Sequence, residues 1–183
     1  MARGHTTLNS PPPSQDEAYR EAAETYGGAI VRLARGYERD ADLARDLVQD
    51  IHAALWRSFA YFERQCSVRS WVYRIAHNVA VSHVQAALRR KSGGLVELDE
   101  IDTLAAPDNP EADVGEAQAS QRLLSTIHRL KPADRQVMLL YLEDLTAAEI
   151  GEVTGLSPGA VATRISRVKS LLAESFQSPE TER

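Results

Sequence analysis

The sequence predicts an all-α protein made of two small helical domains joined by a flexible acidic linker. Three observations predict this: apolar residues recur at steps of three and four, no segment alternates like a strand, and charge is segregated along the chain. The predicted parts are a disordered leader at 1–14, a first domain at 15–92, a linker at 93–117, a second domain at 118–175 and a tail at 176–183.

Composition excludes several classes of protein. The chain has 183 residues, of which 43% are hydrophobic and 26% charged, as in ordinary globular proteins. Cys66 is the only cysteine, which excludes an intrachain disulfide and a cysteine-based zinc site. The apolar stretches are far shorter than the roughly 20 residues of a membrane-spanning helix, and no secretory signal begins the sequence. We therefore expect a cytoplasmic protein without direct membrane insertion.

The net charge of −5 conceals a segregation of acids and bases. Residues 93–117 hold eight acids and no base, together with three glycines and two prolines, which is typical of a linker. The flanking domains are mildly basic, at +2 for residues 15–92 and +1 for residues 118–175. The acidic total therefore does not exclude nucleic acid as a partner.

The first domain is predicted to be a three-helix bundle. Helical periodicity places its helices at about 19–36, 42–59 and 68–88. Asp40 or Asp42 can cap the second helix. We expect both tryptophans in the core, since Trp56 adjoins a buried-type leucine and Trp71 lies beside the apolar stripe of the third helix.

The second domain contains a predicted helix-turn-helix. It is preceded by one helix at about 121–130 and another that begins at Pro132. Thr146 and Glu149 fit a capping box, and Gly155 can end the short helix that they open. Ser157 can then cap a second helix. Two short helices around a glycine turn are typical of the motif whose second helix enters the DNA major groove.

The second helix of this motif has an apolar side and a basic side. Val161, Ile165 and Val168 form the inward stripe. Arg164 and Arg167 lie three residues apart on the outer side, where they can reach guanine edges or phosphates. The alternative is an ordinary helical hairpin with a solvated basic face.

Two surfaces of the first domain also stand out. Asp42, Asp46 and Asp50 form an acidic stripe that, from the residues alone, favours a solvated face. Residues 69–91 mix bases with aromatic side chains, a combination that single-stranded DNA binding uses. Within it, the Asn78 amide can pair with a base edge.

These segments together resemble extracytoplasmic-function sigma factors, the smallest class of bacterial sigma factors. The resemblance rests on Asp46-Leu47-Val48-Gln49-Asp50 followed by Leu55-Trp56 for region 2.1–2.2. It rests further on Ser70-Trp71-Val72-Tyr73-Arg74-Ile75-Ala76-His77-Asn78 for region 2.3–2.4, and on Leu130-Lys131-Pro132-Ala133-Asp134-Arg135 through Arg167 for region 4. Three motifs in the family's order make the resemblance specific.

The resemblance implies a factor that binds core RNA polymerase and directs promoter-specific transcription initiation. It implies that the β′ clamp helices and the β flap are the polymerase contacts and that an anti-sigma factor is a further partner. The residues that would bind polymerase are Asp46, Leu47, Gln49 and Asp50, which replaces the solvated-face interpretation of the acidic stripe.

The resemblance also implies how promoter DNA is bound. The minus-ten element would be bound as an opened strand by the 61–68 loop and by Arg69, Ser70, Tyr73, Arg74, His77 and Asn78. The minus-thirty-five element would be bound as duplex by Ser157, Ala160, Thr163, Arg164, Arg167 and Lys169. The chain departs from the family at Ala160, where a threonine hydroxyl is usual, which puts a phosphate contact there in doubt.

Two other classes of function remain as alternatives. A stand-alone helix-turn-helix regulator would bind DNA without polymerase. An enzyme is not expected, because the five histidines fit no metal or catalytic motif and no glycine-rich phosphate loop is present. We accordingly expect no cofactor, no metal, no catalytic residue and no small-molecule substrate, and we expect Cys66 to be inert.

Overall fold

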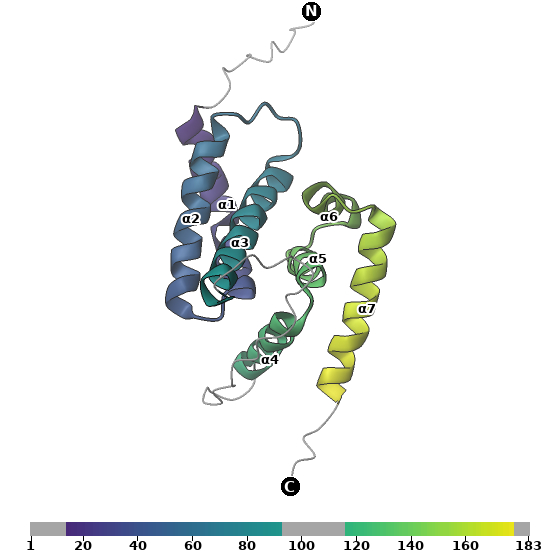
Figure 1. The fold of residues 1–183 in the computed structure, drawn as a ribbon. Coiled ribbons are helices and arrows are strands. Elements are labelled where there is room, and N and C mark those ends of the chain that lie inside the picture. The colour runs from purple at the N-terminus through teal and green to yellow at the C-terminus, as the bar shows by residue number, and fades with distance from the viewer. Residues whose placement is uncertain (1–13, 93–115, 178–183) are drawn as a thin grey trace, which may run out of the picture.

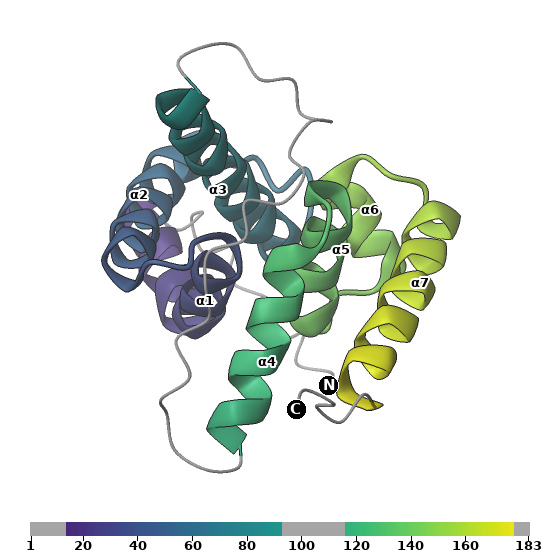
Figure 2. The same cartoon turned by 60° about the horizontal axis from the view of Figure 1, so that its bottom comes forward.

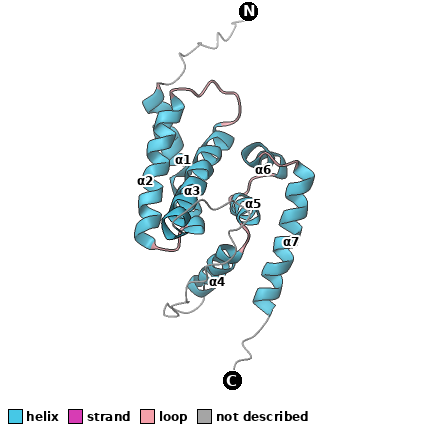
Figure 3. Cartoon of the chain, viewed as in Figure 1, coloured by secondary structure: helices cyan, strands magenta, loops and turns pink. Residues whose placement is uncertain are grey.

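The structure, a computed structural model, describes residues 14–92 and 116–177. Within these ranges the chain is entirely helices and connecting loops, which confirms the predicted all-α class (Figure 3). The helices are α1 (Gln15–Tyr37), α2 (Ala41–Phe59), α3 (Val68–Ser92), α4 (Glu116–Arg129), α5 (Pro132–Leu142), α6 (Ala147–Thr154) and α7 (Pro158–Gln177). The predicted leader and most of the predicted linker and tail lie outside the described residues.

Side-chain caps fix the starts of several helices, among them α1, α2 and α6. Ser14 and Glu17 form a capping box at α1, and Thr146 forms one with Glu149 at α6. At α2 the carboxylate of Asp40 accepts hydrogen bonds from the backbone of Asp42 and Leu43, at 2.9 and 3.0 Å. Each such cap is worth about 1 kcal/mol of stability. Of the two predicted cap residues for α2, Asp40 is therefore the one used.

Helices α1, α2 and α3 form the predicted bundle around fully buried apolar side chains. Leu33, Leu55 and Val72 have at most 2% of their surface exposed. Trp71 is partly buried against this core, and its indole N–H donates to the Ser58 hydroxyl at 3.0 Å. The prediction for Trp56 is wrong, because this side chain is 44% exposed.

The geometry of a helix explains the position of Trp56. Neighbouring residues project about 100° apart around the axis, so a residue next to buried Leu55 can lie at the edge of the bundle. There the indole N–H of Trp56 donates to the Asp16 carboxylate at 2.8 Å. Sequence adjacency to a core residue was therefore a poor guide to burial.

Helices α6 and α7 form the predicted helix-turn-helix. Gly155 ends α6 in the left-handed conformation, with φ of 77°. Gly151 lies against the turn: a Cβ atom there would be 2.7 Å from the carbonyl oxygen of Leu156. The Ser157 hydroxyl accepts from the backbone of Ala160 at 3.3 Å, which caps α7. The inner stripe of α7 is buried at Val161 and Val168.

The two halves of the chain pack against each other, which the sequence did not predict. Helix α6 lies against α3, and α4 and α5 lie against α1 (Figures 1 and 2). Gly36 of α1 permits a close approach, because a Cβ atom there would overlap the Leu139 side chain of α5. One continuous apolar cluster includes buried residues of both halves.

No helix in the described ranges is long and apolar enough to cross a membrane. Two helix ends differ from the predicted domain boundaries: α4 begins two residues inside the predicted linker, and α7 runs two residues into the predicted tail.

The close contact at Gly151 gives a first prediction. Gly151→Ala should lower the free energy of unfolding by about 1–3 kcal/mol, because the methyl group would overlap a backbone carbonyl that cannot rotate away. Gly159→Ala is the matched control: nothing lies within 4 Å of its added methyl group, so it should be neutral or stabilising. Chemical denaturation measures both, and equal effects of the two substitutions would contradict the packing at Gly151.

Candidate nucleic-acid and protein interfaces

The acidic stripe of α2 presents three of its four predicted polymerase contacts to solvent. Asp46, Gln49 and Asp50 are exposed, whereas Leu47 is fully buried in the bundle. Asp46 and Asp50 line one side of a groove between α2 and α3, and Arg90 lies on its α3 side. Arg57 and Arg89 also line the groove, so side chains of both signs of charge face it.

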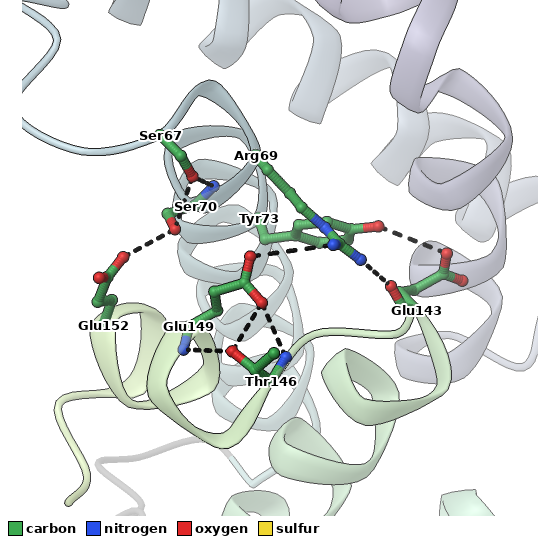
Figure 4. A network of polar contacts seen from close by, with 8 residues as sticks. All are labelled: Ser67, Arg69, Ser70, Tyr73, Glu143, Thr146, Glu149 and Glu152. Carbon is green, nitrogen blue, oxygen red and sulfur yellow. Dashed lines mark hydrogen bonds and ion pairs between the residues drawn. The ribbon is translucent and has the colours of Figure 1, made fainter. Parts of the chain in front are cut away.

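The first turns of α3 hold four of the predicted minus-ten residues, and α6 covers them. The Ser70 hydroxyl donates to the Glu152 carboxylate at 2.8 Å, and the Arg74 guanidinium donates to the Glu152 carbonyl at 3.0 Å. The Arg69 guanidinium donates to the Glu143 carbonyl and lies 3.9 Å from the Glu149 carboxylate. Figure 4 shows the contacts of Ser70 and Arg69 from close by.

Glu143 lies at the centre of the contact between the two halves. Its carboxylate accepts two hydrogen bonds from the Arg32 guanidinium, at 2.7 and 2.6 Å, and one from the Tyr73 hydroxyl at 3.5 Å. The Glu143 side chain is only 9% exposed, while that of Arg32 is 64% exposed. The hydrogen bond to Glu143 raises the pKa of Arg32, and burial raises the pKa of Tyr73 to about 12.

His77 and Asn78 are adjacent in sequence but lie in different environments. His77 is 6% exposed, and its Nδ1 atom lies 2.6 Å from the Tyr37 hydroxyl in the bundle. Burial lowers the pKa of His77 to about 4, so the ring is neutral at pH 7. Asn78 is exposed on α3. Of this pair, only the asparagine presents its side chain to solvent.

On α7 the two predicted DNA-binding arginines share one carboxylate. Asp134 of α5 is 5% exposed, and it accepts from Arg164 at 2.7 Å and from Arg167 at 2.5 Å. The other predicted residues of this face, Ser157, Thr163 and Lys169, are exposed, and Ala160 is half-buried. The Lys169 ammonium lies 3.3 Å from the Tyr141 hydroxyl.

Several interface residues were missed from the sequence. Arg32, Glu143 and Glu152 contact residues 70 to 111 positions away, and no local pattern signals such pairs. Asp134 carries a partial signal, since it is an acid in the first turn of a helix that precedes the basic face of α7. Among the described residues, no cluster of three or more His, Cys, Asp or Glu side chains could hold a metal ion.

Comparison with known families finds two matches in tandem. Residues 22–90 match the family described as Sigma-70 region 2, and residues 120–172 match Sigma-70 region 4. The first match covers the three-helix bundle, and the second covers the helix-turn-helix with the two helices before it.

Individual relatives agree with these matches. The ECF RNA polymerase sigma factor SigG of Mycobacterium tuberculosis is 28% identical over an alignment of 163 residues that covers 76% of this chain and 44% of that relative. The chain thus spans less than half the length of SigG. The ECF RNA polymerase sigma-E factor of Haemophilus influenzae is 25% identical over 169 residues, with 88% of each chain covered.

A solved structure shares the fold. CnrH, solved in complex with the cytosolic domain of CnrY, superimposes with a TM-score of 0.65 at 22% identity, over 90% of this chain and 91% of that one.

The buried histidine gives a second prediction. Its folded pKa of about 4 lies below the unfolded value of 6.5, so the folded state binds fewer protons between these values. Stability is therefore fully present above pH 6.5 and is lost as the pH falls towards 4, by about 3 kcal/mol for this group.

His77→Gln should remove that part of the pH dependence. Denaturant unfolding at a series of pH values from 7 to 4 measures the slope in both proteins. His52 and His128, whose pKa values burial also lowers, contribute equally to both slopes and serve as the internal control. Identical slopes in the two proteins would show that His77 is not buried in its neutral form.

Proposed function

Because the chain belongs to the extracytoplasmic-function group of the sigma-70 family, we propose that it binds core RNA polymerase and directs promoter-specific transcription initiation. The observation that carries this proposal is the tandem of regions 2 and 4 in one chain, each on its own helical unit. A stand-alone helix-turn-helix regulator would need only the second unit. The region 2 match therefore favours the sigma factor over that alternative.

We assign polymerase docking to the exposed face of α2 that carries Asp46, Gln49 and Asp50. The β′ clamp helices are the expected partner, and Leu47 supports this face from beneath as a buried residue. Carboxylates at the rim of a docking surface steer a basic partner and fix its register. The β flap is the expected partner of the second domain.

Promoter contacts are divided between the two domains. We assign the minus-ten element, as an opened strand, to the start of α3 and to Asn78. We assign the minus-thirty-five element, as duplex, to α7 through Ser157, Thr163, Arg164, Arg167 and Lys169, because its exposed face has the shape and charge of a major-groove helix.

The low charge of each domain supports a dependence on polymerase. Net charges of +2 and +1 neutralise few phosphates, and each neutralised phosphate contributes a salt slope of only about −0.9. Polymerase that holds both domains at a fixed spacing would turn two weak contacts into one strong contact. Unstacking costs on the order of a few kcal/mol per base step, and capture of an unpaired base would offset that cost.

Further partners follow from the same assignment. CnrH was solved with the cytosolic domain of CnrY, which supports a protein partner of this kind, an anti-sigma factor, for the present chain. The family assignment supports a non-enzymatic role in the cytoplasm, where polymerase and promoter DNA are found. Run-off transcription with core polymerase and a random promoter library tests the function directly, and no specific transcript from any template would refute it.

The docking face gives a third prediction. Asp50→Arg should abolish assembly with core polymerase without unfolding the chain, because Asp50 is exposed and the substitution places a cation against a basic partner. Co-purification with core polymerase measures assembly, and circular dichroism measures folding. Glu21→Arg makes the same charge change on exposed α1 and should assemble normally. Normal assembly of Asp50→Arg would refute the docking role.

Asn78 gives a fourth prediction. Asn78→Ala should reduce open-complex formation by the holoenzyme by about 1–3 kcal/mol, because a base-edge pair is lost, while duplex binding changes little. Permanganate reactivity of melted bases and a gel-shift of the closed complex measure the two steps. Ser82→Ala, exposed one turn further along α3, is the control. Equal losses in both steps would contradict capture of a single strand.

A further inference from the structure

The contact between the two halves covers the surface proposed to bind the minus-ten strand. Ser70 and Tyr73 are only 1% and 3% exposed, and both bond to the second domain, Ser70 to Glu152 of α6 and Tyr73 to Glu143 of the α5–α6 turn. We propose that the second domain inhibits the first within the same chain, by placing oxygen atoms of Glu143, Glu149 and Glu152 where phosphates of the promoter strand would bind. This inference rests on the proposed function and names how that site is regulated.

The chemistry of the contact is that of a phosphate site. Arg32 holds the Glu143 carboxylate through two parallel hydrogen bonds of 2.7 and 2.6 Å, the geometry in which arginine also binds phosphate. Arg69 and Arg74 donate to backbone carbonyls of the second domain, at 2.5 and 3.0 Å. Carboxylate or carbonyl oxygens thus accept hydrogen bonds from all three guanidinium groups, two at the start of α3 and one on the neighbouring face of α1.

The shape of the contact is as specific as its charge. Gly36 of α1 leaves room for the Leu139 side chain, and the His128 ring of α4 lies 2.8 Å from the Arg35 carbonyl oxygen. Apolar side chains of α5 and α6, among them Leu139 and Ile150, belong to the same buried cluster as the first-domain core. The covering is therefore a packed interface with a fixed register.

The proposed polymerase-docking face remains open in this arrangement. Asp46, Gln49 and Asp50 are all exposed on α2, and within residues 14–92 and 116–177 this helix makes no prominent contact with the second domain. Core polymerase can therefore engage the closed chain first. When the second domain then moves to its own site on polymerase, the minus-ten surface would be uncovered. The chain would therefore bind the minus-ten strand only after it has docked on polymerase.

The loss of DNA affinity that closure causes in the absence of polymerase can be bounded. When only a fraction of molecules is open, the apparent affinity falls by that fraction, so one open molecule in ten weakens binding about tenfold. Variants that open the chain should regain this factor in the absence of polymerase.

The test reverses charges at the best-defined pair. Arg32→Glu and Glu143→Arg each place two like charges side by side. Because the Glu143 side chain is only 9% exposed, solvent screens their repulsion little. Each should increase the radius of gyration of the free full-length chain in small-angle X-ray scattering. Glu143→Arg should also tighten binding to a single-stranded oligonucleotide of the minus-ten element, taken from a promoter selected by run-off transcription, by about tenfold. Arg32→Glu removes a guanidinium of the phosphate site, so its opening is scored by the radius alone.

Three controls separate opening from other effects. The two substitutions change net charge in opposite directions, so a shared increase in radius cannot arise from net charge. The double variant Arg32→Glu with Glu143→Arg restores opposite charges and should return both measurements towards wild type. Arg20→Glu, exposed elsewhere on α1, should leave the radius unchanged.

Glu152→Arg keeps the test decisive if either first variant fails to fold. The Glu152 carboxylate is exposed on α6 and bonds only to Ser70 across the interface, so its replacement should open the chain without cost to α6. An unchanged radius in all folded variants, or no recovery in the double variant, would overturn the inference. Run-off transcription by wild-type holoenzyme is scored separately: its absence would refute the proposed function, whereas normal transcription with unchanged radii would refute only the inhibition.

Discussion

Burial of narrow apolar stripes is the constraint on which this structure depends. Helices of 8 to 25 residues are marginal alone in water, and most of their stability comes from packing an amphipathic face. Packing of α1, α2 and α3 against one another meets part of this need for burial. Helices α5 and α6 complete the burial of their own apolar faces against α1 and α3. The demand for buried surface thus draws the two helical units into one continuous core.

Polar contacts then give that packing a fixed register. Individual ion pairs on an exposed surface contribute little, and Arg32 is well exposed. Glu143 differs, because its carboxylate is nearly buried and would be costly to leave without partners. The same residue therefore makes the closed arrangement specific and provides the place where reversal of charge would disrupt it. An open chain keeps Glu143 hydrated, so opening needs no unpaired buried charge.

Local features of the fold could be predicted from the sequence, and contacts between distant segments could not. The caps at Asp40 and Thr146 and the left-handed Gly155 are local signals with a direct physical cause, and they were found. The orientation of a side chain around a helix was less secure: Trp56 proved exposed, and Leu47 and His77, both named as contacts, proved buried. The pairing of Arg32 with Glu143 spans 111 positions and leaves no periodic trace in either segment.

The position of Asp134 has a consequence for how α7 meets its target. A long basic side chain normally gives up much rotational freedom when it settles on a base edge, and this loss weakens recognition. Here a buried carboxylate already anchors two guanidinium groups, so part of that ordering is completed before any nucleic acid arrives. Because Asp134 neutralises part of their charge, the two guanidinium groups also present less net positive charge to a nucleic-acid partner. As the proposed binder of the minus-thirty-five element, such a helix would lose some non-specific electrostatic attraction and discriminate more sharply between sequences.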